Sequence, residues 1–341
     1  MTQKRILSSL SPSPGTAFPV LPARGRSARP LLGAALTAVA ALLVGGAALP
    51  GPPSPPHGTN ILVMGTDGRP TAGGACDCAD ALMLVHVSAA EDRVSVVGLP
   101  RESAARLPAH RDVRTGRERP ARTARLGTAY AEGGSALTVR TVEATTGLRV
   151  DRYLQVDFRR FTAAVDRVGG VETCGARPPE GASPARRLLA GGPALRYLRS
   201  RHADGGAGRV RRLQRFLVDA LRRLQARRLL TDPVGAARLA RTVLGGAEQG
   251  YDTAGLVRLA GVLDRVPATA TEFAEVPVTR FAPARRGSGA AVAWDGERAA
   301  RMFSTLDADH SLTGAAGAPA AGDPPRFGNH PAVRGGSLAC P

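Results

Sequence analysis

The sequence predicts an α/β or α+β domain that follows a single apolar segment near the N-terminus. Short apolar runs of strand length lie early in the chain, and stretches with helical spacing alternate with them and follow them. Hydrophobic residues make up 43% of the 341 residues, which is enough for a sizeable core. Aromatic residues make up only 4%, so we expect that core to be mostly aliphatic.

The N-terminal region predicts a membrane anchor. Residues 1–30 are rich in Ser, Pro and Arg and have no apolar periodicity, which is typical of a disordered tail. Residues 31–49 carry no charge, and their length is close to the ~20 residues that span a bilayer as a helix. Because Arg24, Arg26 and Arg29 precede this run, the positive-inside rule places the tail in the cytoplasm and the rest of the chain outside.

A cleavable signal peptide is the alternative to an anchor, since Gly46, Ala47 and Ala48 are small enough for cleavage. The long tail and the full-length apolar run favour an uncleaved, single-pass anchor in the cell membrane. The Pro-rich residues 50–59 then predict a stiff, extended spacer before the folded domain.

The folded domain is expected over residues 60–309. Apolar runs predict strands at 60–65, 81–87 and 93–99, the last two as a hairpin, and at 153–158, 275–281 and 290–294. Helical spacing predicts helices at 137–145, 161–168, 211–224, 233–264 and 297–306, whereas 195–201 reads as a strand or a helix end. The stretch 104–124 reads as a basic loop, and the Gly/Ala/Pro-rich residues 310–341 as a disordered tail.

The formal net charge of +18 comes almost entirely from arginine, because Lys4 is the only lysine. A basic chain raises the question of nucleic-acid binding. The arginines are scattered along the whole chain and stacking aromatics are scarce, so no nucleic-acid partner is predicted. A basic exterior suits anionic lipid headgroups and anionic polymers.

The four cysteines are Cys76, Cys78, Cys174 and Cys340. An even number in an exported chain predicts disulfides rather than a metal or redox site. Cys76 and Cys78 are too close in sequence to bond readily to each other. We therefore expect them to pair with Cys174 and Cys340, in an order that the sequence leaves open.

Five charged residues at the ends of predicted elements are candidates for binding a phosphate and a cation. Asp67 directly follows one strand and Asp80 opens the next, and two carboxylates at strand ends can share one Mg²⁺. Arg199 and Arg201 point to one face if their segment is extended, which matches the oxygens of a phosphate. Arg101, at the end of a strand, is the third arginine expected to bind the phosphate. Taken singly, each of these residues also has a purely structural explanation; an Asp at the end of a strand, for example, commonly caps a turn.

Seven segments in order resemble the LytR-CpsA-Psr family, the cell-wall glycopolymer ligases of Gram-positive bacteria, in its actinobacterial type. They lie between Asn60 and about Leu224 and read NILVMGTD (60–67), DALMLVH (80–86), VSVVGLPR (94–101), LGTAYAEGG (126–134), VDRYLQVDF (150–158), VGGVE (168–172) and ALRYLRSRH (194–202). The anchor, spacer and external domain also fit the layout of this family.

The resemblance implies an α-β-α sandwich with a central mixed sheet and an apolar tunnel for a lipid. It implies an enzyme, a magnesium-dependent phosphotransferase that moves a glycopolymer from a polyprenyl-pyrophosphate carrier to a peptidoglycan hydroxyl and forms a phosphodiester. Residues 216–224 would line the tunnel as well as the core.

The resemblance also implies roles for particular residues. Asp67 and Asp80 match the magnesium-linked aspartates. The motif positions expected to bind the pyrophosphate or its surroundings are Arg101, Arg125, Arg199, Arg201, Arg209 and Gln214.

Several positions depart from the family pattern. An arginine and a hydroxyl residue that flank the second aspartate are replaced by Cys78 and Ala81, and a glutamine is replaced by Leu213. Arg125 takes the place of a lysine, which keeps the charge but changes the phosphate contact. These departures leave two alternatives open, namely a catalytically weak protein that binds polyprenyl pyrophosphate and a regulator of envelope synthesis. The anchor argues against a regulator that binds DNA, because the domain would face away from it.

Overall fold

The computed structural model describes residues 57–66, 79–174, 186–200, 205–244, 253–282, 291–314 and 332–339. They belong to one compact unit, residues 51–341, and residues 1–50 lie outside the described part. The predicted anchor, 31–49, therefore lies outside the described residues. Among the helices that are described, we find none with the length and apolar character to cross a membrane.

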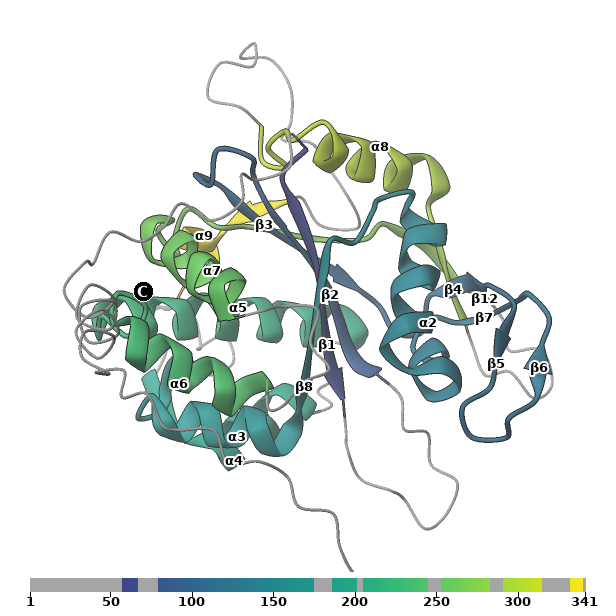
Figure 1. Ribbon diagram of the computed structural model, residues 1–341. Helices are drawn as coiled ribbons and strands as arrows, with labels where there is room; N and C mark the ends of the chain where they lie inside the picture. The colour runs from purple at the N-terminus through teal and green to yellow at the C-terminus, as the bar shows by residue number, and fades with distance from the viewer. Residues whose placement is uncertain are drawn as a thin grey trace, which may run out of the picture. The chain divides into compact units, whose positions relative to one another are not determined.

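A six-stranded mixed sheet forms the centre of the domain, in the order β14-β11-β3-β2-β1-β8 (Figure 1). Its strands are β1 (Thr59–Thr66), β2 (Ala79–Val87), β3 (Val94–Leu99), β8 (Arg152–Asp157), β11 (Glu272–Glu275) and β14 (Val333–Arg334). The first three form an antiparallel meander, which confirms the predicted hairpin of β2 and β3. On its flanks, β8 runs parallel to β1 and β11 runs parallel to β3.

Helices cover both faces of this sheet, which is the layered arrangement expected when strands alternate with helices. One face packs on α2 (Thr128–Thr146) and α8 (Gly296–Asp307). The other packs on α5 (Gly205–Ala226) and α7 (Thr253–Arg265). The alternation of side chains along a strand explains the two cores, because Leu62 and Met64 face the first layer whereas Ile61 faces the second.

A third apolar cluster joins the helices next to β8 to α5. It brings together side chains of α3 (Phe158–Arg167), α4 (Gly191–Arg199), α5 and α6 (Pro233–Leu244). The Asp157 side chain caps α3 by accepting a hydrogen bond from the Arg160 backbone N–H. Gly191 at the start of α4 sits so close to α3 that a Cβ would lie 2.2 Å from the Thr162 carbonyl oxygen. The end of α4 is thereby held near the end of β8.

The structure corrects two sequence predictions. Residues 104–124 are not an irregular loop but belong to two short antiparallel ribbons, which pair β4 (Ala104–Leu107) with β7 (Arg122–Arg125) and β5 (His110–Arg111) with β6 (Glu118–Arg119). Within the predicted tail, residues 332–339 form β14 and α9 (Gly335–Leu338). The strands of the ribbons, β14 and α9 are all too short for their sequences to show a periodic pattern of apolar residues. They form because other elements supply their partners.

Smaller differences concern strand ends. The predicted strand 275–281 corresponds to β12 (Val278–Ala282) and overlaps β11 only at Glu275, with Pro277 between the two strands; β12 pairs with β13 (Ala291–Trp294). Proline lacks the N–H that a continuous strand would donate, so the break at this position follows from its chemistry. A further pair, β9 (Val171–Cys174) and β10 (Arg186–Leu189), packs beside α5.

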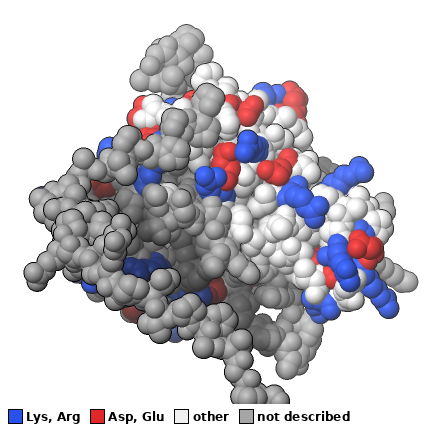
Figure 2. All heavy atoms as spheres, in the orientation of Figure 1, with Lys and Arg blue, Asp and Glu red and all other residues white. Residues whose placement is uncertain are grey.

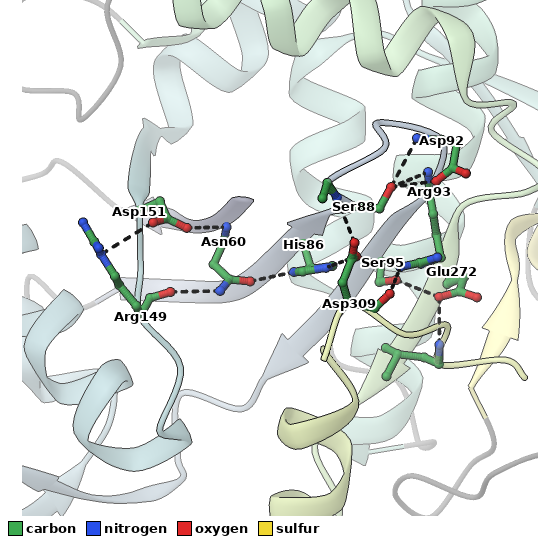
Figure 3. Close-up of polar contacts among 12 residues, drawn as sticks. Asn60, His86, Ser88, Asp92, Arg93, Ser95, Arg149, Asp151, Glu272 and Asp309 are labelled. Carbon is green, nitrogen blue, oxygen red and sulfur yellow. Dashed lines mark hydrogen bonds and ion pairs between the residues drawn. The ribbon is translucent and has the colours of Figure 1, made fainter. Parts of the chain in front are cut away.

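A buried row of polar side chains crosses the sheet at its far end (Figure 3). The strand register aligns Asn60 with His86, His86 with Ser95, and Ser95 with Glu272. Each is at most 2% exposed, and the segment that follows α8 covers them. His86 Nδ1 donates to Asn60 Oδ1 at 2.8 Å, and His86 Nε2 lies 3.0 Å from Asp309 Oδ1. Buried polar groups need such partners, and here the partners fasten residues 309–313 to the sheet.

Candidate functional site

The site is built where β2 begins and β3 ends. The two strands are antiparallel, with Leu82 opposite Leu99, so Asp80 and Arg101 meet at the same edge of the sheet. Arg101 Nη1 donates a hydrogen bond to Asp80 Oδ1, and Arg101 Nε donates one to Glu102 Oε1 at 2.8 Å. Burial of Arg101 opposes its charge, but Glu102 and Asp80 outweigh that effect and raise the pKa of the guanidinium. Arg101 therefore stays cationic at this edge.

Arg199 reaches the same carboxylate from the other side. It is the last residue of α4, and its Nη2 lies 3.9 Å from Asp80 Oδ2. Its guanidinium carbon lies 4.9 Å from the ring centroid of Phe158, a cation–π contact that orients the side chain. About half of the Arg199 side chain is exposed, whereas Asp80 is mostly buried. Two arginines thus meet at one carboxylate, and Arg101 also pairs with Glu102. Guanidinium groups gathered in this way match the oxygens of a phosphate.

The start of α2 closes the site beside Arg101. Gly127 donates its backbone N–H to the Arg101 carbonyl at 2.8 Å. A Cβ at this position would lie 3.1 Å from Arg101 Cβ and 3.2 Å from the Ala79 carbonyl oxygen, so glycine allows the close approach. Arg125 lies two residues earlier, exposed at the end of β7. The sequence signal for Gly127 was its place in the segment LGTAYAEGG.

The structure thus brings together three of the predicted site residues: Asp80, Arg101 and Arg199. Asp67 and Arg201 lie outside the described residues. Arg209 lies in the first turns of α5, and its side chain is not described. Gln214 is buried on α5 and donates Nε2–H to the Ala274 carbonyl at 3.2 Å, which ties α5 to β11. The predicted substrate contacts of these residues stay predictions.

An incompletely filled apolar face lies on the same central sheet as the site. Val63 of β1, Val85 of β2 and Leu154 of β8 lie on the central sheet but are only partly buried, as are Leu217 and Leu221 of α5 above them. Side chains in the middle of a sheet normally reach full burial against a helical layer. Further out, a pocket of about 250 Å³ lies between α6 and α7 and is lined by Ala236, Ala237, Ala240, Arg241, Leu256 and Val257. The layer between sheet and helices therefore leaves apolar surface accessible.

Cys174 is the only cysteine among the described residues. It is buried in β9 and is not a free thiol. The three other cysteines lie outside the described residues, so the pairing stays a prediction.

The sequence analysis did not single out Glu275, a charged residue of the central sheet. It ends β11 opposite Gly98 of β3, on the sheet face covered by α5. Burial raises the pKa of Glu275 to about 7, although Arg211 on α5 acts in the opposite direction. Its only sequence signal was a carboxylate at the end of an apolar run.

We expect Glu275→Gln to make stability less sensitive to pH. The pKa of the unfolded carboxyl is near its ordinary value of 4.5, while in the folded protein the pKa of Glu275 is about 7. Wild-type stability should therefore fall as the pH rises between these values, and be lowest above them. The variant should exceed the wild type by roughly 2 kcal/mol at about pH 8 and match it at about pH 4. Urea unfolding at both pH values tests this, with exposed Glu118→Gln as the control. An equal difference at both pH values would contradict it.

The fold and the site define a class of protein. The chain is a layered α/β domain with a mixed central sheet, and a pair of arginines converges on an aspartate at the edge of that sheet. A sequence profile of the LytR_cpsA_psr family matches residues 52–287. The chain belongs to the LytR-CpsA-Psr family.

Individual relatives agree with this assignment. The chain is 28% identical over 272 residues to the probable cell wall biosynthesis protein LcpB of Corynebacterium glutamicum, a match that covers 73% of this chain and 61% of LcpB. It is 28% identical over 167 residues to the polyisoprenyl-teichoic acid–peptidoglycan teichoic acid transferase TagU of Oceanobacillus iheyensis, which covers 47% of this chain and 49% of TagU. The chain thus spans about half to three fifths of the length of these relatives.

Solved structures share the fold. The crystal structure of TagV from B. subtilis superposes with a TM-score of 0.57 at 20% identity, over 74% of this chain and 98% of TagV. TagT with bound octaprenyl pyrophosphate lipid superposes with a TM-score of 0.55 at 16% identity, over 77% of this chain and 95% of TagT. This likeness confirms the predicted mixed α/β fold.

Proposed function

We propose that the protein is a membrane-anchored, extracytoplasmic phosphotransferase that moves a glycopolymer from a polyprenyl-pyrophosphate carrier to peptidoglycan. The observation that carries the proposal is the convergence of Arg101 and Arg199 on Asp80, at the edge of a sheet that also has a face with partly accessible apolar side chains. One ligand that has both an anionic head and an apolar chain fits these two features together. Family membership supports the same conclusion, and TagT is a relative in fold that holds such a lipid.

The arginines would act by position and charge. The acceptor hydroxyl oxygen attacks the phosphorus that carries the sugar, the bond from that phosphorus to the bridging oxygen breaks, and the prenyl phosphate leaves while the hydroxyl proton is released. Arg101 and Arg199 hold the pyrophosphate oxygens in place and neutralise the charge that gathers on them. Asp80 keeps the two guanidinium groups oriented before the substrate arrives. The accessible face around Val63, Val85 and Leu154 would receive the prenyl chain.

A magnesium ion at this site would take part of its ligands from the substrate. Mg²⁺ is commonly held by one or two carboxylates together with phosphate oxygens. Among the described residues there is no cluster of three or more side chains that could form a metal site alone, but Asp80 supplies one hard oxygen donor at the edge where the phosphates would lie. Asp67 is the second proposed ligand. When bound, the ion would neutralise phosphate charge.

Identification of the bound lipid tests the proposal. We expect the external domain, purified from a host that makes polyprenyl-linked glycans, to carry a polyprenyl pyrophosphate detectable by mass spectrometry. Incubation with a lipid-linked glycan, a peptidoglycan acceptor and Mg²⁺ should release polyprenyl phosphate, and chelation of the metal should lower that release. Absence of both bound lipid and transfer would contradict the proposal.

A second function, binding without efficient turnover, is favoured by one observation. Ala79 and Ala81 flank Asp80, where the family commonly has a hydroxyl residue after the aspartate. Substituting Ala81→Thr should then raise transfer while lipid binding stays constant. If the wild-type chain already transfers as fast as TagT under the same conditions, this second function is wrong.

A further inference from the structure

The two short ribbons between β3 and α2 carry an unusual concentration of charge. Residues 104–125, hereafter the arginine ribbon, contain seven arginines and two acidic residues, a net charge of +5. The arginines are Arg106, Arg111, Arg114, Arg117, Arg119, Arg122 and Arg125. Figure 2 shows basic side chains gathered over β5 and β6, on the right of the view.

The inner arginines are neutralised and hold the ribbon in shape. Asp112 is buried and accepts hydrogen bonds from Arg119 Nε at 3.1 Å and Nη2 at 2.9 Å, and from the backbone N–H groups of Arg114 and Thr115. Glu132 of α2 accepts from Arg122 Nη2 at 2.6 Å and lies 3.2 Å from His110 Nε2. Charge-assisted bonds of this kind are strong when partly buried. The ribbon is therefore a fixed surface rather than a solvated loop.

The outer arginines have no such compensation. Arg106, Arg111, Arg114, Arg117 and Arg125 are exposed, and within the described part of the chain they form no ion pair. In the β4–β7 ladder Ala104 pairs with Arg125 and Arg106 with Thr123, so the side chains of Arg106 and Arg125 share the outer face. Of the two acids of the ribbon, Asp112 is buried with Arg119, whereas Glu118 is exposed opposite Arg111. Five exposed arginines against one exposed acid leave the outer face with a net positive charge.

The ribbon begins and ends at the site. Leu126 donates to the Ser103 carbonyl and Gly127 to the Arg101 carbonyl, both at 2.8 Å, so the two ends of the ribbon flank Arg101. The β4–β7 ladder alone extends the row of cations by about 10 Å at ~3.3 Å per residue. A chain attached to a pyrophosphate at Arg101 would meet Arg125 first, then Arg106, then the tip.

We infer that the arginine ribbon binds the anionic repeat units of the glycopolymer while its pyrophosphate end is held at Arg101 and Arg199. This inference rests on the proposed function and specifies its substrate class: a glycan with phosphate or carboxylate groups along its length. A lipid surface fits less well, because only one large apolar side chain, Val113, is exposed on the ribbon. A neutral glycan would gain nothing from the row of cations.

The test compares the full chain with the triple variant Arg106→Gln, Arg114→Gln, Arg117→Gln, none of which belongs to the pyrophosphate site. A matched control replaces exposed arginines elsewhere, at Arg167 of α3, Arg187 of β10 and Arg238 of α6, with Gln. The first readout is the Kd for soluble poly(glycerol phosphate), which needs no catalysis. We expect the ribbon variant to bind about tenfold more weakly at low salt, with the control unchanged and the difference shrinking as salt rises.

Further arms separate the outcomes. With a lipid-linked anionic donor, kcat/KM should fall about tenfold in the ribbon variant, and with a short neutral donor it should change less than twofold. Equal poly(glycerol phosphate) binding by both variants would overturn the inference, and so would a loss confined to vesicles of phosphatidylglycerol. If the wild type transfers neither donor, the proposed function fails, while the Kd comparison still decides whether the ribbon binds a polyanion. Unchanged thermal melting of the variants confirms that they fold.

Discussion

Replacing Arg199 by alanine is expected to lower transfer from a lipid-linked donor at least 100-fold. The Arg199 guanidinium is one of two that meet at Asp80, and it is aligned by the Phe158 ring. Removing a charged donor that faces the developing negative charge of a phosphoryl transition state commonly costs two to three orders of magnitude, or about 3–4 kcal/mol. Steady-state release of polyprenyl phosphate at saturating donor measures the effect on kcat.

The same helix offers a matched control. Arg196 lies in the last turn of α4, is exposed and has no described part in the site, so Arg196→Ala should change transfer less than twofold. Arg101→Ala should resemble Arg199→Ala, because Arg101 contacts the same carboxylate. Arg101→Lys should recover part of the loss, since lysine keeps the charge but not the planar, bidentate geometry. Wild-type rates in Arg199→Ala would show that the arginine pair has only a structural role.

Replacing Glu272 by alanine is expected to destabilise the fold by about 4 kcal/mol. Glu272 is 2% exposed and accepts hydrogen bonds from Ser95 Oγ at 2.7 Å, Thr313 Oγ1 at 2.7 Å, Leu312 N at 3.0 Å and Ser311 Oγ. Hydrogen bonds to a charged group contribute about 1.5–3 kcal/mol each, and their loss leaves buried donors without partners. The segment after α8 should then detach from the sheet. In a domain of this size the melting temperature should fall by roughly 10 °C.

The charge state of Glu272 gives this prediction a pH signature. Burial opposes ionisation, but the hydrogen bonds from Ser311, Ser95 and Thr313 outweigh it and lower the pKa of Glu272. A lowered pKa stabilises the fold above the pKa of the unfolded carboxyl and loses that contribution as the pH falls through the folded value. The difference between wild type and Glu272→Ala should therefore shrink in acid. Glu297→Ala, on the exposed surface of α8 and paired with Arg301, should change stability by less than ~0.5 kcal/mol at any pH.

The polar row also shows why part of the architecture was invisible in the sequence. His86 and Ser95 each looked like one more position of an apolar strand. Their partners, Asn60 and Glu272, lie 26 and 177 residues away. Only the register of neighbouring strands aligns these residues, and the pattern of apolar residues along one strand does not reveal which residues of another strand it pairs with. For the same reason, residues 310–313 are predicted from the sequence as the start of a disordered tail, whereas the structure binds them to Glu272.

In the candidate site, too, some residues could be predicted from the local sequence pattern, whereas the position of others depends on tertiary contacts. Asp80 and Arg101 were predictable because an antiparallel hairpin brings the start of one strand to the end of the other. Arg199 was also predicted to belong to the site. That prediction assumed an extended segment, in which Arg199 and Arg201 would point to the same face. In the structure Arg199 ends a helix and Ser200 is extended, and its direction comes from Phe158.

By itself, the sequence determined the central strands, most of the helices, the family and the charged residues that meet at the edge of the sheet. These features are encoded by short-range periods and by ordered segments, which a single chain displays without its partners. The tertiary structure alone decided the shape of the arginine ribbon, the docking of residues 332–339 on β11 and the sharing of Asp80 between two arginines. Each of these depends on contacts between residues far apart in the chain, and a contact of that kind has no local signature until the strands are in register.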